Sequence, residues 1–351
     1  MKKLLYISNV YWEWIYQRPQ IIADGLSDEF EVTYVYQKWP FMKLELTRDT
    51  ARMKYRRFSY IPFVEVSKIA RKFYVWYNLK NTFYDLDMFD YVYICYPSYK
   101  MLLENYKGKI IYDCIDNHAA MTYGKILRNF LEASEIDLIN RSSKIFATAK
   151  LLQDKIYENT GKKAALVRNG YIKGKEYPIK KACVKDKYTV GYFGTIASWF
   201  DYKSLAFAHD KVKNVSYRII GPGKNRVNED YISYRDSVEH GLLYENVKDC
   251  DCLILPFVLN EITLSVDPVK LYEYIDFGKC IISVYYPEIE RFGDFVYFYK
   301  DEAEYAKVLS QLVKEGFPPK YNDKQREEFL QQNTWECRIK QIIREITDID
   351  G

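Results

Sequence analysis

Short apolar runs alternate with amphipathic helical patterns along most of this 351-residue chain. Continuous apolar runs of this kind are typical of parallel strands that helices cover on both faces. The first group of expected strands covers residues 4–8, 31–36, 91–96, 109–115, 144–149 and 164–168. The second group covers residues 189–194, 216–221, 252–257, 280–284 and 296–299. Helical patterns lie between them, at residues 18–26, 125–140, 151–160, 202–211 and 269–277. The alternation predicts an α/β fold with parallel, doubly wound sheets.

A polar, lysine-rich segment at residues 171–187 divides the two groups of strands. We therefore expect one Rossmann-like domain at residues 1–172, a second at 188–333, and a last helix within 334–351, for which Thr334 is the expected N-cap. Two doubly wound domains in tandem would bring the carboxyl edges of two sheets to one cleft.

Composition narrows the class of protein. Hydrophobic residues make up 48% of the chain and charged residues 28%, which is typical of a globular protein with a large core. The net charge of +4 gives no general case for nucleic acid binding. Seven scattered cysteines and three distant histidines predict no metal site. There is neither a signal peptide pattern nor an apolar run of membrane-spanning length, so a cytoplasmic location is expected.

The strongest candidate site is the strand, loop and helix at residues 253–278. Asp267 is the expected N-cap of that helix, Pro268 suits its first turn and Gly278 its end. The free amides and the dipole of a helix N-terminus attract anions.

Two charged side chains add to this helix. Lys270 lies in the first turn, and Glu273 follows on the same face. A nucleotide diphosphate on the amides and Lys270, with its ribose hydroxyls on Glu273, would fit this arrangement. A capped amphipathic helix with a surface Lys and Glu is the structural alternative.

The order of several motifs resembles the GT-B glycosyltransferases, particularly the family-4-like bacterial enzymes of cell-surface polysaccharide assembly. In the second half the motifs are at residues 191–196, 219–222, 254–257 and 267–274, and in the first half at 14–20, 112–116 and 168–170. The resemblance covers nearly the whole chain and includes Asn333-Thr-Trp335. It implies two Rossmann-like domains facing across a cleft, and a last helix that returns to the first domain.

The resemblance also implies a set of donor-binding residues. Glu273 matches the second glutamate of the E-x7-E motif of the family, which contacts the ribose. The turn at Gly194 would approach the phosphate from the other side of the cleft, since a glycine lets the backbone come close. The complete expected set is Gly194, Thr195, Asp267, Val269, Lys270, Leu271 and Glu273.

The chain departs from the family pattern at three places. The first glutamate of E-x7-E is replaced by Ser265, and Asp267 or Glu261 would have to substitute for it. Residues 8–12 replace the usual glycine-rich loop. The Arg/Lys pair typical of retaining members is not evident beyond Lys270, so retention and inversion both stay open.

Catalytic candidates lie in the first half of the chain. An inverting enzyme needs a general base, and Asp116, at the end of a buried strand, is the leading candidate. His118 is the rival base or an orienting partner, and strand-end capping is the structural alternative for Asp116. Trp12, Gln17 and Arg18 are the expected acceptor-binding residues, although core packing and helix-start chemistry explain them equally well.

A basic and aromatic stretch covers residues 52–80. It holds eight Lys or Arg and a single acidic residue, Glu65. We expect either a solvated helix face or a contact with anionic lipid headgroups, which would bring the protein to the cytoplasmic face of a membrane. Nucleic acid fits least, because no recognised binding motif accompanies the stretch.

The sequence therefore predicts a metal-independent glycosyltransferase without a cofactor. It would move a sugar from a nucleotide diphosphate, expected to be UDP, to a growing and lipid-linked surface polysaccharide. A UDP-sugar epimerase of the same fold and a non-catalytic nucleotide-sugar binding subunit are the alternatives. An NAD-dependent oxidoreductase is disfavoured, because no G-x-G-x-x-G follows either opening strand.

Overall fold

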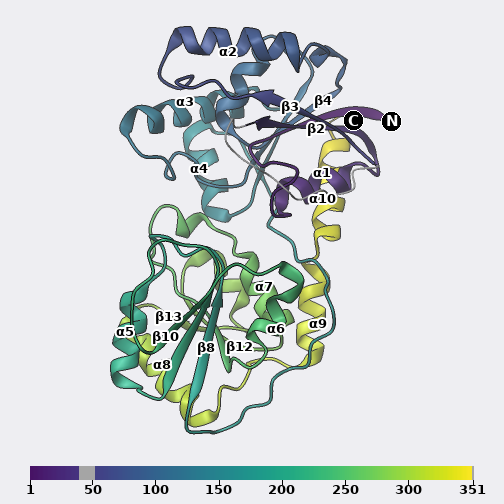
Figure 1. The fold of residues 1–351 in the computed structure, drawn as a ribbon. Coiled ribbons are helices and arrows are strands. Elements are labelled where there is room, and N and C mark those ends of the chain that lie inside the picture. Colours follow the sequence, from purple (N-terminus) through teal and green to yellow (C-terminus); the bar gives the residue numbers. More distant parts are fainter. Residues whose placement is uncertain (39–51, 350–351) are drawn as a thin grey trace. The chain divides into compact units, whose positions relative to one another are not determined.

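The computed structural model describes residues 1–38 and 52–349, and these form two compact units. Unit 1 consists of Met1–Gly170 together with Trp335–Gly351, and unit 2 consists of Tyr171–Thr334 (Figure 1). Each unit has its own parallel sheet with helices on both faces. The expected α/β fold with two doubly wound domains is therefore confirmed.

The sheet of unit 1 has seven strands in the order β3-β2-β1-β4-β5-β6-β7, and every pair is parallel. The strands are β1 (Lys2–Ser8), β2 (Phe30–Lys38), β3 (Lys54–Ser59), β4 (Tyr91–Ile94), β5 (Lys109–Cys114), β6 (Lys144–Ala147) and β7 (Ala165–Leu166). Its helices are α1 (Arg18–Leu26), α2 (Lys68–Asn81), α3 (Lys125–Arg141), α4 (Lys150–Thr160) and α10 (Trp335–Thr347). The described residues of the unit also form two 3-10 helices, η1 (Leu86–Met88) and η2 (Pro97–Leu103).

Two hydrophobic clusters cover the faces of this sheet. Helices α2, α3 and α4 contribute Tyr74, Leu138 and Ile156 to one cluster. Helices α1 and α10 contribute to the other, in which Ile342 of α10 is fully buried. Gly25 lets α10 come close to α1, because a Cβ atom at this position would lie 2.3 Å from Cδ1 of Ile339. The return of the last helix to the first domain is confirmed.

The sheet of unit 2 has six parallel strands in the order β10-β9-β8-β11-β12-β13. They are β8 (Tyr188–Phe193), β9 (Val215–Ile220), β10 (Ile232–Arg235), β11 (Cys252–Leu255), β12 (Cys280–Val284) and β13 (Tyr297–Tyr299). The helices are α5 (Tyr202–Lys211), α6 (Leu243–Val247), α7 (Val269–Asp276), α8 (Glu302–Glu315) and α9 (Asp323–Gln332). Short 3-10 helices are η3 (His240–Leu242), η4 (Thr263–Ser265) and η5 (Pro287–Phe292).

The polar segment at residues 171–187 packs along unit 2. The amide of Lys180 donates to the carbonyl of Gly278 at 2.8 Å, and its ammonium pairs with Asp251 at 2.7 Å. The amide of Cys183 donates to the carbonyl of Gly316 at 3.0 Å. Its polar sequence therefore belongs to an extended surface segment, and the two units divide after Gly170.

Each sheet has one point at which the strand order reverses. In unit 2 it lies between β8 and β11, and in unit 1 between β1 and β4. Ligands of open α/β sheets bind outside the carboxyl ends of the strands at such points. The turn after β8 and the helix after β11, which is α7, therefore mark the expected binding edge of unit 2. None of the helices in the described ranges is both long and apolar enough to cross a bilayer.

Candidate functional site

Two glycine turns and a lysine meet at the binding edge of unit 2. Gly194 follows β8 with φ of +135°, and its amide donates to the carbonyl of Ile220 at 2.8 Å. A Cβ atom at Gly194 would lie 2.2 Å from Cε of Lys270, so the lysine side chain lies directly against this turn. Gly221 follows β9 with φ of +136°, and a Cβ atom there would lie 2.2 Å from the carbonyl oxygen of Gly194. Only glycine fits at either position.

Lys270 has no hydrogen bond or ion pair with any side chain in the described part of the chain. It lies in the first turn of α7, and its side chain is half-buried. Burial lowers the pKa of the ammonium, and the nearby charge of Glu273 opposes that shift. The first amides of a helix also have no intrahelical acceptor. An unpaired cation beside free amides forms a site for an anion such as phosphate.

Glu273 lies one turn further along α7 and has a partner that sequence reasoning missed. Its Oε1 atom lies 2.6 Å from Nε2 of His240, which is exposed at the start of η3. The hydrogen bond that the His240 ring donates to this carboxylate raises the pKa of His240. His240 lies 33 positions upstream of Glu273 and belongs to no motif, so only the fold reveals the pair.

Asp267 does not cap α7, and this prediction is wrong. Pro268 occupies the N-cap position, with no side-chain hydrogen bond to the helix. The carboxylate of Asp267 is buried and instead pairs with the guanidinium of Arg291, which also donates to the hydroxyl of Tyr272 at 3.0 Å. The pair ties η5 to the start of α7. The helix ends at Asp276 and is followed by Gly278 with φ of +64°, as expected.

The structure also shows the contacts of Ser265, which replaces the first glutamate of E-x7-E. Ser265 is buried, and its hydroxyl donates to the carbonyl of Ile262 at 2.7 Å and to that of Glu261 at 3.3 Å. The hydroxyl therefore closes its own 3-10 turn. Glu261 is exposed on the same loop.

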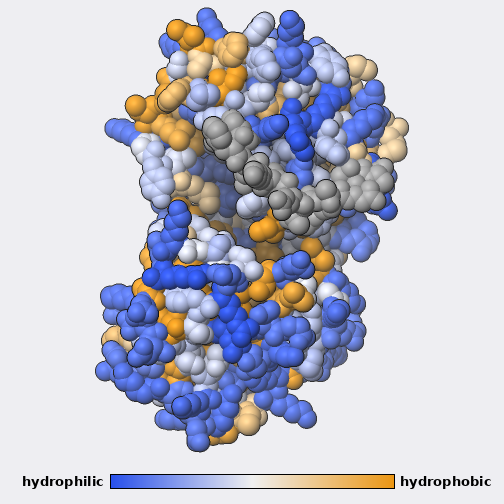
Figure 2. Space-filling model, in the orientation of Figure 1, coloured by the Kyte–Doolittle hydropathy of each residue, from blue (hydrophilic) through white to orange (hydrophobic). Residues whose placement is uncertain are grey.

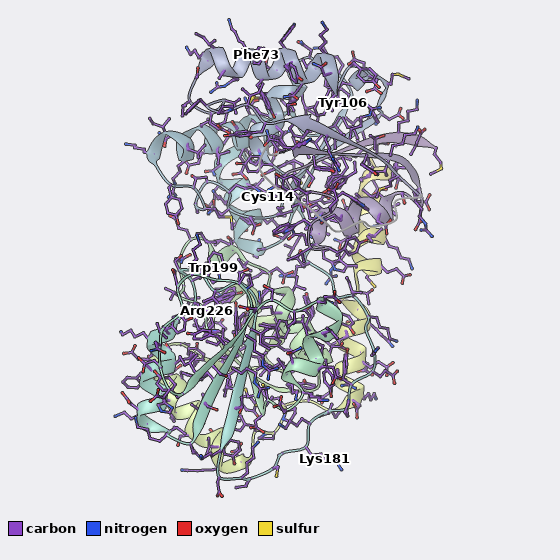
Figure 3. The ribbon with its side chains drawn as sticks, in the orientation of Figure 1. Phe73, Tyr106, Cys114, Lys181, Trp199 and Arg226 are labelled. Atoms are coloured by element: carbon purple, nitrogen blue, oxygen red, sulfur yellow. The ribbon has the colours of Figure 1, made fainter. Side chains whose placement is uncertain are left out.

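The other expected donor residues differ in accessibility. Thr195 is exposed, and its carbonyl accepts a hydrogen bond from Tyr192 at 3.1 Å. Val269 is half-buried at the start of α7. Leu271 is fully buried in the core, and its amide donates to the carbonyl of Pro268 at 3.1 Å, so neither its side chain nor its amide is open to a ligand. Trp199, labelled in Figure 3, follows this turn and accepts from the amide of Val258 at 2.7 Å.

Arg18 and Asp113 form a buried ion pair in unit 1. Their side chains are 6% and 0% exposed, and Nε and Nη2 of Arg18 donate to the two carboxylate oxygens at 2.9 and 2.8 Å. The guanidinium also reaches the carbonyl of Arg168 at 3.3 Å. Tyr93 donates its hydroxyl to Asp113 at 2.9 Å. Arg18 therefore links α1, β5 and the end of β7 inside unit 1, a structural role that the helix-start alternative did not include.

Asp116 lies two residues beyond β5 and has a different environment. It is half-buried, and no side-chain or amide donor in the described ranges reaches its carboxylate. Burial raises its pKa, and the nearby charges of His118 and Arg18 oppose the shift. A carboxylate with a raised pKa and free oxygens suits a general base. His118 is buried, with Nε2 at 3.2 Å from the carbonyl of Cys95 and its ring edge-on to Tyr96, so it is held by the protein.

The two other expected acceptor residues take structural positions. Trp12 is buried and packs edge-on against Tyr34 at 5.2 Å between ring centroids. Gln17 is the N-cap of α1, and its amide donates to Oε1 of Gln20 at 3.2 Å. Both positions match the core-packing and helix-start alternatives.

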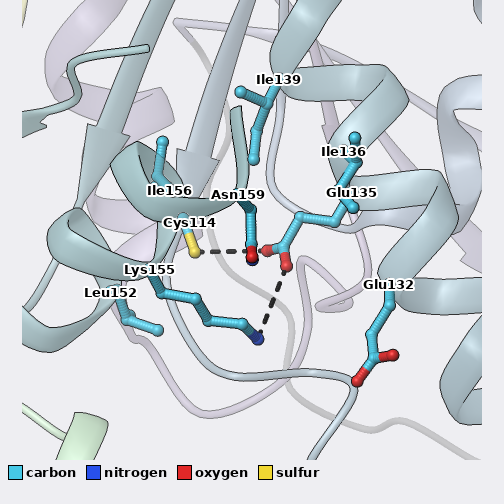
Figure 4. Close-up of a pocket in the computed structure, with 9 residues that line it drawn as sticks. All are labelled: Cys114, Glu132, Glu135, Ile136, Ile139, Leu152, Lys155, Ile156 and Asn159. Carbon is cyan, nitrogen blue, oxygen red and sulfur yellow. Dashed lines mark hydrogen bonds and ion pairs between the residues drawn. The ribbon is translucent and has the colours of Figure 1, made fainter. Parts of the chain in front are cut away.

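A cavity of about 270 Å³ lies between α3 and α4 of unit 1 (Figure 4). Glu135 at its centre accepts from the hydroxyl of Tyr112 at 2.6 Å and from Sγ of Cys114 at 3.5 Å, and the ammonium of Lys155 lies 4.0 Å away. Burial raises the pKa of the Cys114 thiol, which makes it a poor nucleophile. The polar groups around Glu135 are therefore hydrogen-bond and ion-pair partners of one another. Across residues 1–38 and 52–349, three or more metal-ligating side chains do not gather at any point.

Comparisons with known proteins agree with this architecture. No protein-family model matches the chain. The chain is 22% identical over 284 residues to the Bacillus subtilis protein named "Putative teichuronic acid biosynthesis glycosyltransferase TuaH", which covers 71% of this chain and 70% of that one.

Two solved structures are similar over nearly their whole length. Sucrose-phosphate synthase from Thermosynechococcus elongatus gives a TM-score of 0.72 at 11% identity and covers 99% of both chains. Anabaena HepE, solved in complex with UDP and glucose, gives a TM-score of 0.69 at 13% identity, with 99% of this chain and 100% of that chain covered. The chain therefore has the GT-B fold, and its similarities place it beside the glycosyltransferases of that fold.

Proposed function

We propose that this protein is a glycosyltransferase that moves a hexose from a UDP-sugar to a hydroxyl group of a growing surface polysaccharide. The observation that carries the proposal is the unpaired Lys270 at the start of α7, against the turn at Gly194. It lies at the strand reversal of unit 2, where α/β sheets bind ligands. The similarity to TuaH and to a structure that holds UDP and glucose supports the choice of reaction and nucleotide.

Each charged group then has a role in the reaction. The α7 amides and Lys270 stabilise the negative charge that grows on the departing UDP, a task that needs no metal ion. Glu273 accepts hydrogen bonds from the ribose hydroxyls, in competition with His240. In an inverting reaction Asp116 takes the proton of the acceptor hydroxyl as the new glycosidic bond forms. In a retaining reaction Asp116 instead contacts sugar hydroxyls.

The acceptor is proposed to be a lipid-linked glycan of capsule or exopolysaccharide type, handled at the cytoplasmic face of a membrane. The assignment of TuaH to teichuronic acid biosynthesis supports a surface polysaccharide. The exposed lysines of α2, which are Lys68, Lys72 and Lys80, support a membrane location.

One observation favours a second candidate, a non-catalytic subunit that binds nucleotide sugar. The position of the first glutamate of E-x7-E is occupied by Ser265, whose hydroxyl is turned into its own loop. Such a protein would keep the diphosphate site at Lys270 and lose the contact to the sugar.

The test is to incubate the full chain with a panel of nucleotide sugars, with and without lipid-linked or simple glycoside acceptors. Acceptor-dependent release of UDP with a glycosylated product supports transfer, and the anomer of the product, read by NMR, separates inversion from retention. A changed sugar without acceptor would identify an epimerase. Tight binding of a nucleotide sugar without either product would support the non-catalytic binding subunit.

Two variants test the site itself. Lys270→Met and Glu273→Gln should each weaken UDP binding about tenfold or more, because each loses a charged hydrogen bond to the nucleotide. Lys203→Met is the matched control, since Lys203 is exposed and pairs with Glu302 on the outer helices of unit 2. Unchanged UDP affinity in both site variants would overturn the assignment.

A further inference from the structure

One face of α2 leaves four large apolar side chains uncovered. Ile69, Phe73, Trp76 and Tyr77 are 83%, 50%, 57% and 36% exposed. Their spacing puts them on one side of the helix. The ring of Phe73, labelled in Figure 3, lies 5.8 Å from that of Trp76 and 5.9 Å from that of Tyr77, so the rings form one continuous surface. In Figure 2, hydrophobic residues gather at the end of unit 1 that α2 occupies.

The opposite side of α2 fixes the helix in this orientation. Tyr74 and Asn78 are buried, and the Asn78 side chain bonds both the amide and the carbonyl of Ser59, at 2.9 and 3.2 Å. Ser67 caps the helix by accepting from the amide of Ala70 at 3.3 Å. The aromatic face therefore points outward because polar and packing contacts hold the other face against the sheet.

The turn before α2 extends the same surface. Phe63 is 69% exposed and has φ of +64°. This left-handed backbone conformation is energetically unfavourable for any residue other than glycine. Its carbonyl accepts from the amides of Val66 and Ser67 at 3.2 and 2.8 Å, which holds the turn. Val66 is exposed as well. The strained turn keeps an aromatic ring mostly in solvent, where it gains little packing within unit 1.

The structure separates the basic stretch at residues 52–80 into two parts. The cations on and before β3 are used inside unit 1: Lys54 pairs with Glu31 at 2.8 Å, Arg56 with Asp85 at 2.6 Å, and Arg57 with Glu13. The other part is α2, where an exposed set of lysines has no ion pair with any described residue, namely Lys68, Lys72 and Lys80. The helix holds no acidic residue. Exposed cations therefore coincide with the uncovered aromatic face, and the ammonium of Lys80 lies 5.7 Å from the centre of the Trp76 ring.

We propose that this α2 face, with the turn at Phe63, docks the protein on a bilayer of anionic phospholipid. Exposed aromatic and aliphatic side chains enter the boundary between headgroups and acyl chains, while lysines bind the phosphates. A second copy of the chain is a poorer occupant, since two such faces would bring their unpaired lysines together. The inference rests on the proposed function in one respect only: a lipid-linked acceptor would lie at the membrane surface to which this face binds.

The experiment is co-sedimentation of the full chain with vesicles of phosphatidylcholine alone and with added phosphatidylglycerol. We expect binding that requires the anionic lipid and weakens with salt. Phe73→Ser/Trp76→Ser should reduce the partition coefficient about tenfold or more. The triple variant Lys68→Gln/Lys72→Gln/Lys80→Gln should reduce it about 100-fold, at about fivefold for each lysine.

Two control variants match the changes in exposure and charge. Tyr157→Ser/Ile172→Ser replaces side chains that are 56% and 48% exposed elsewhere. Lys181→Gln/Lys307→Gln/Lys314→Gln removes the same charge from unit 2, and both controls should bind like the unaltered chain. The proposal would be overturned by equal binding to both vesicle types or by unchanged binding of the α2 variants. It would also be overturned if light scattering showed a dimer that the aromatic variant abolishes. UDP binding measured on the same variants keeps this test separate from the proposed function, because it should not change.

Discussion

The ion pair between Arg18 and Asp113 allows a quantitative test of how unit 1 is held together. Arg18→Met removes a guanidinium that donates to both carboxylate oxygens, at 2.9 and 2.8 Å. Asp113, which is fully buried, then keeps the hydroxyl of Tyr93 at 2.9 Å as a side-chain donor. Breaking a buried pair from one side costs about 3–5 kcal/mol, because the remaining charge is uncompensated.

We therefore expect the free energy of unfolding of unit 1 to fall by about 4 kcal/mol. With an m-value of about 2 kcal/mol/M in urea, the unfolding midpoint should fall by about 2 M. Tryptophan fluorescence suits the measurement, because five of the six tryptophans belong to Met1–Gly170 and Trp335–Gly351. Lys100→Met is the control: it breaks a half-exposed pair with Asp137 and should cost less than about 1 kcal/mol.

The single variant Asp113→Asn and the double variant Arg18→Met/Asp113→Asn complete the double-mutant cycle. The double variant removes both charges, so it should be more stable than Arg18→Met by about 1 kcal/mol or more. The reasoning would be refuted if the stability losses of the two single variants simply added in the double variant. It would also be refuted if Arg18→Met lost no more stability than the control. Arg18 would then be free to serve the acceptor, as the sequence alone also allowed.

Three further predictions concern the two candidate sites. Gly221→Ala should destabilise unit 2 by about 2 kcal/mol or more, measured by urea unfolding followed by circular dichroism, because its Cβ would lie 2.2 Å from the carbonyl oxygen of Gly194; a neutral effect would contradict the geometry. Asp116→Asn should lower kcat about 100-fold with UDP affinity unchanged, and an unchanged kcat would remove Asp116 as the base. The raised pKa of His240 means that its charge, and its hold on Glu273, are lost as pH rises. UDP affinity, measured by calorimetry, should therefore rise as the pH rises through the pKa of His240, and His240→Ala should abolish that rise.

Most of the strands that the sequence predicted have both faces buried, although the edge strands β7 and β13 were predicted as well. Continuous apolar runs identified β1, β5, β8 and β12, because the strands of a parallel sheet that helices cover on both faces bury nearly all of their side chains. The edge strands β3 and β10 were missed. Half of each of these two edge strands faces solvent and carries polar residues. The sequence pattern of β3 is therefore a basic stretch, and that of β10 is a short polar stretch.

The site was predictable where neighbours in sequence define it. Lys270 and Glu273 lie on one helix, so their spacing placed them together. The Asp267 cap failed because Arg291, 24 positions away, competes for the same carboxylate. His240 and the partner of Arg18, 95 positions away, are brought in by the fold, and local patterns carry no signal for such contacts.

The packing of α10 against α1 has a consequence for synthesis of the chain. Ile342 and Ile346 are fully buried in a core whose other buried members, apart from Trp335, come from residues 4–167. Yet α10 follows all of unit 2 in the sequence, so the ribosome makes it last of these elements. Because domains otherwise fold as they emerge, unit 1 must wait with the apolar side of α1 uncovered while unit 2 is made. We expect this nascent intermediate to be the species that recruits chaperones, and slow translation of unit 2 to lengthen its exposure.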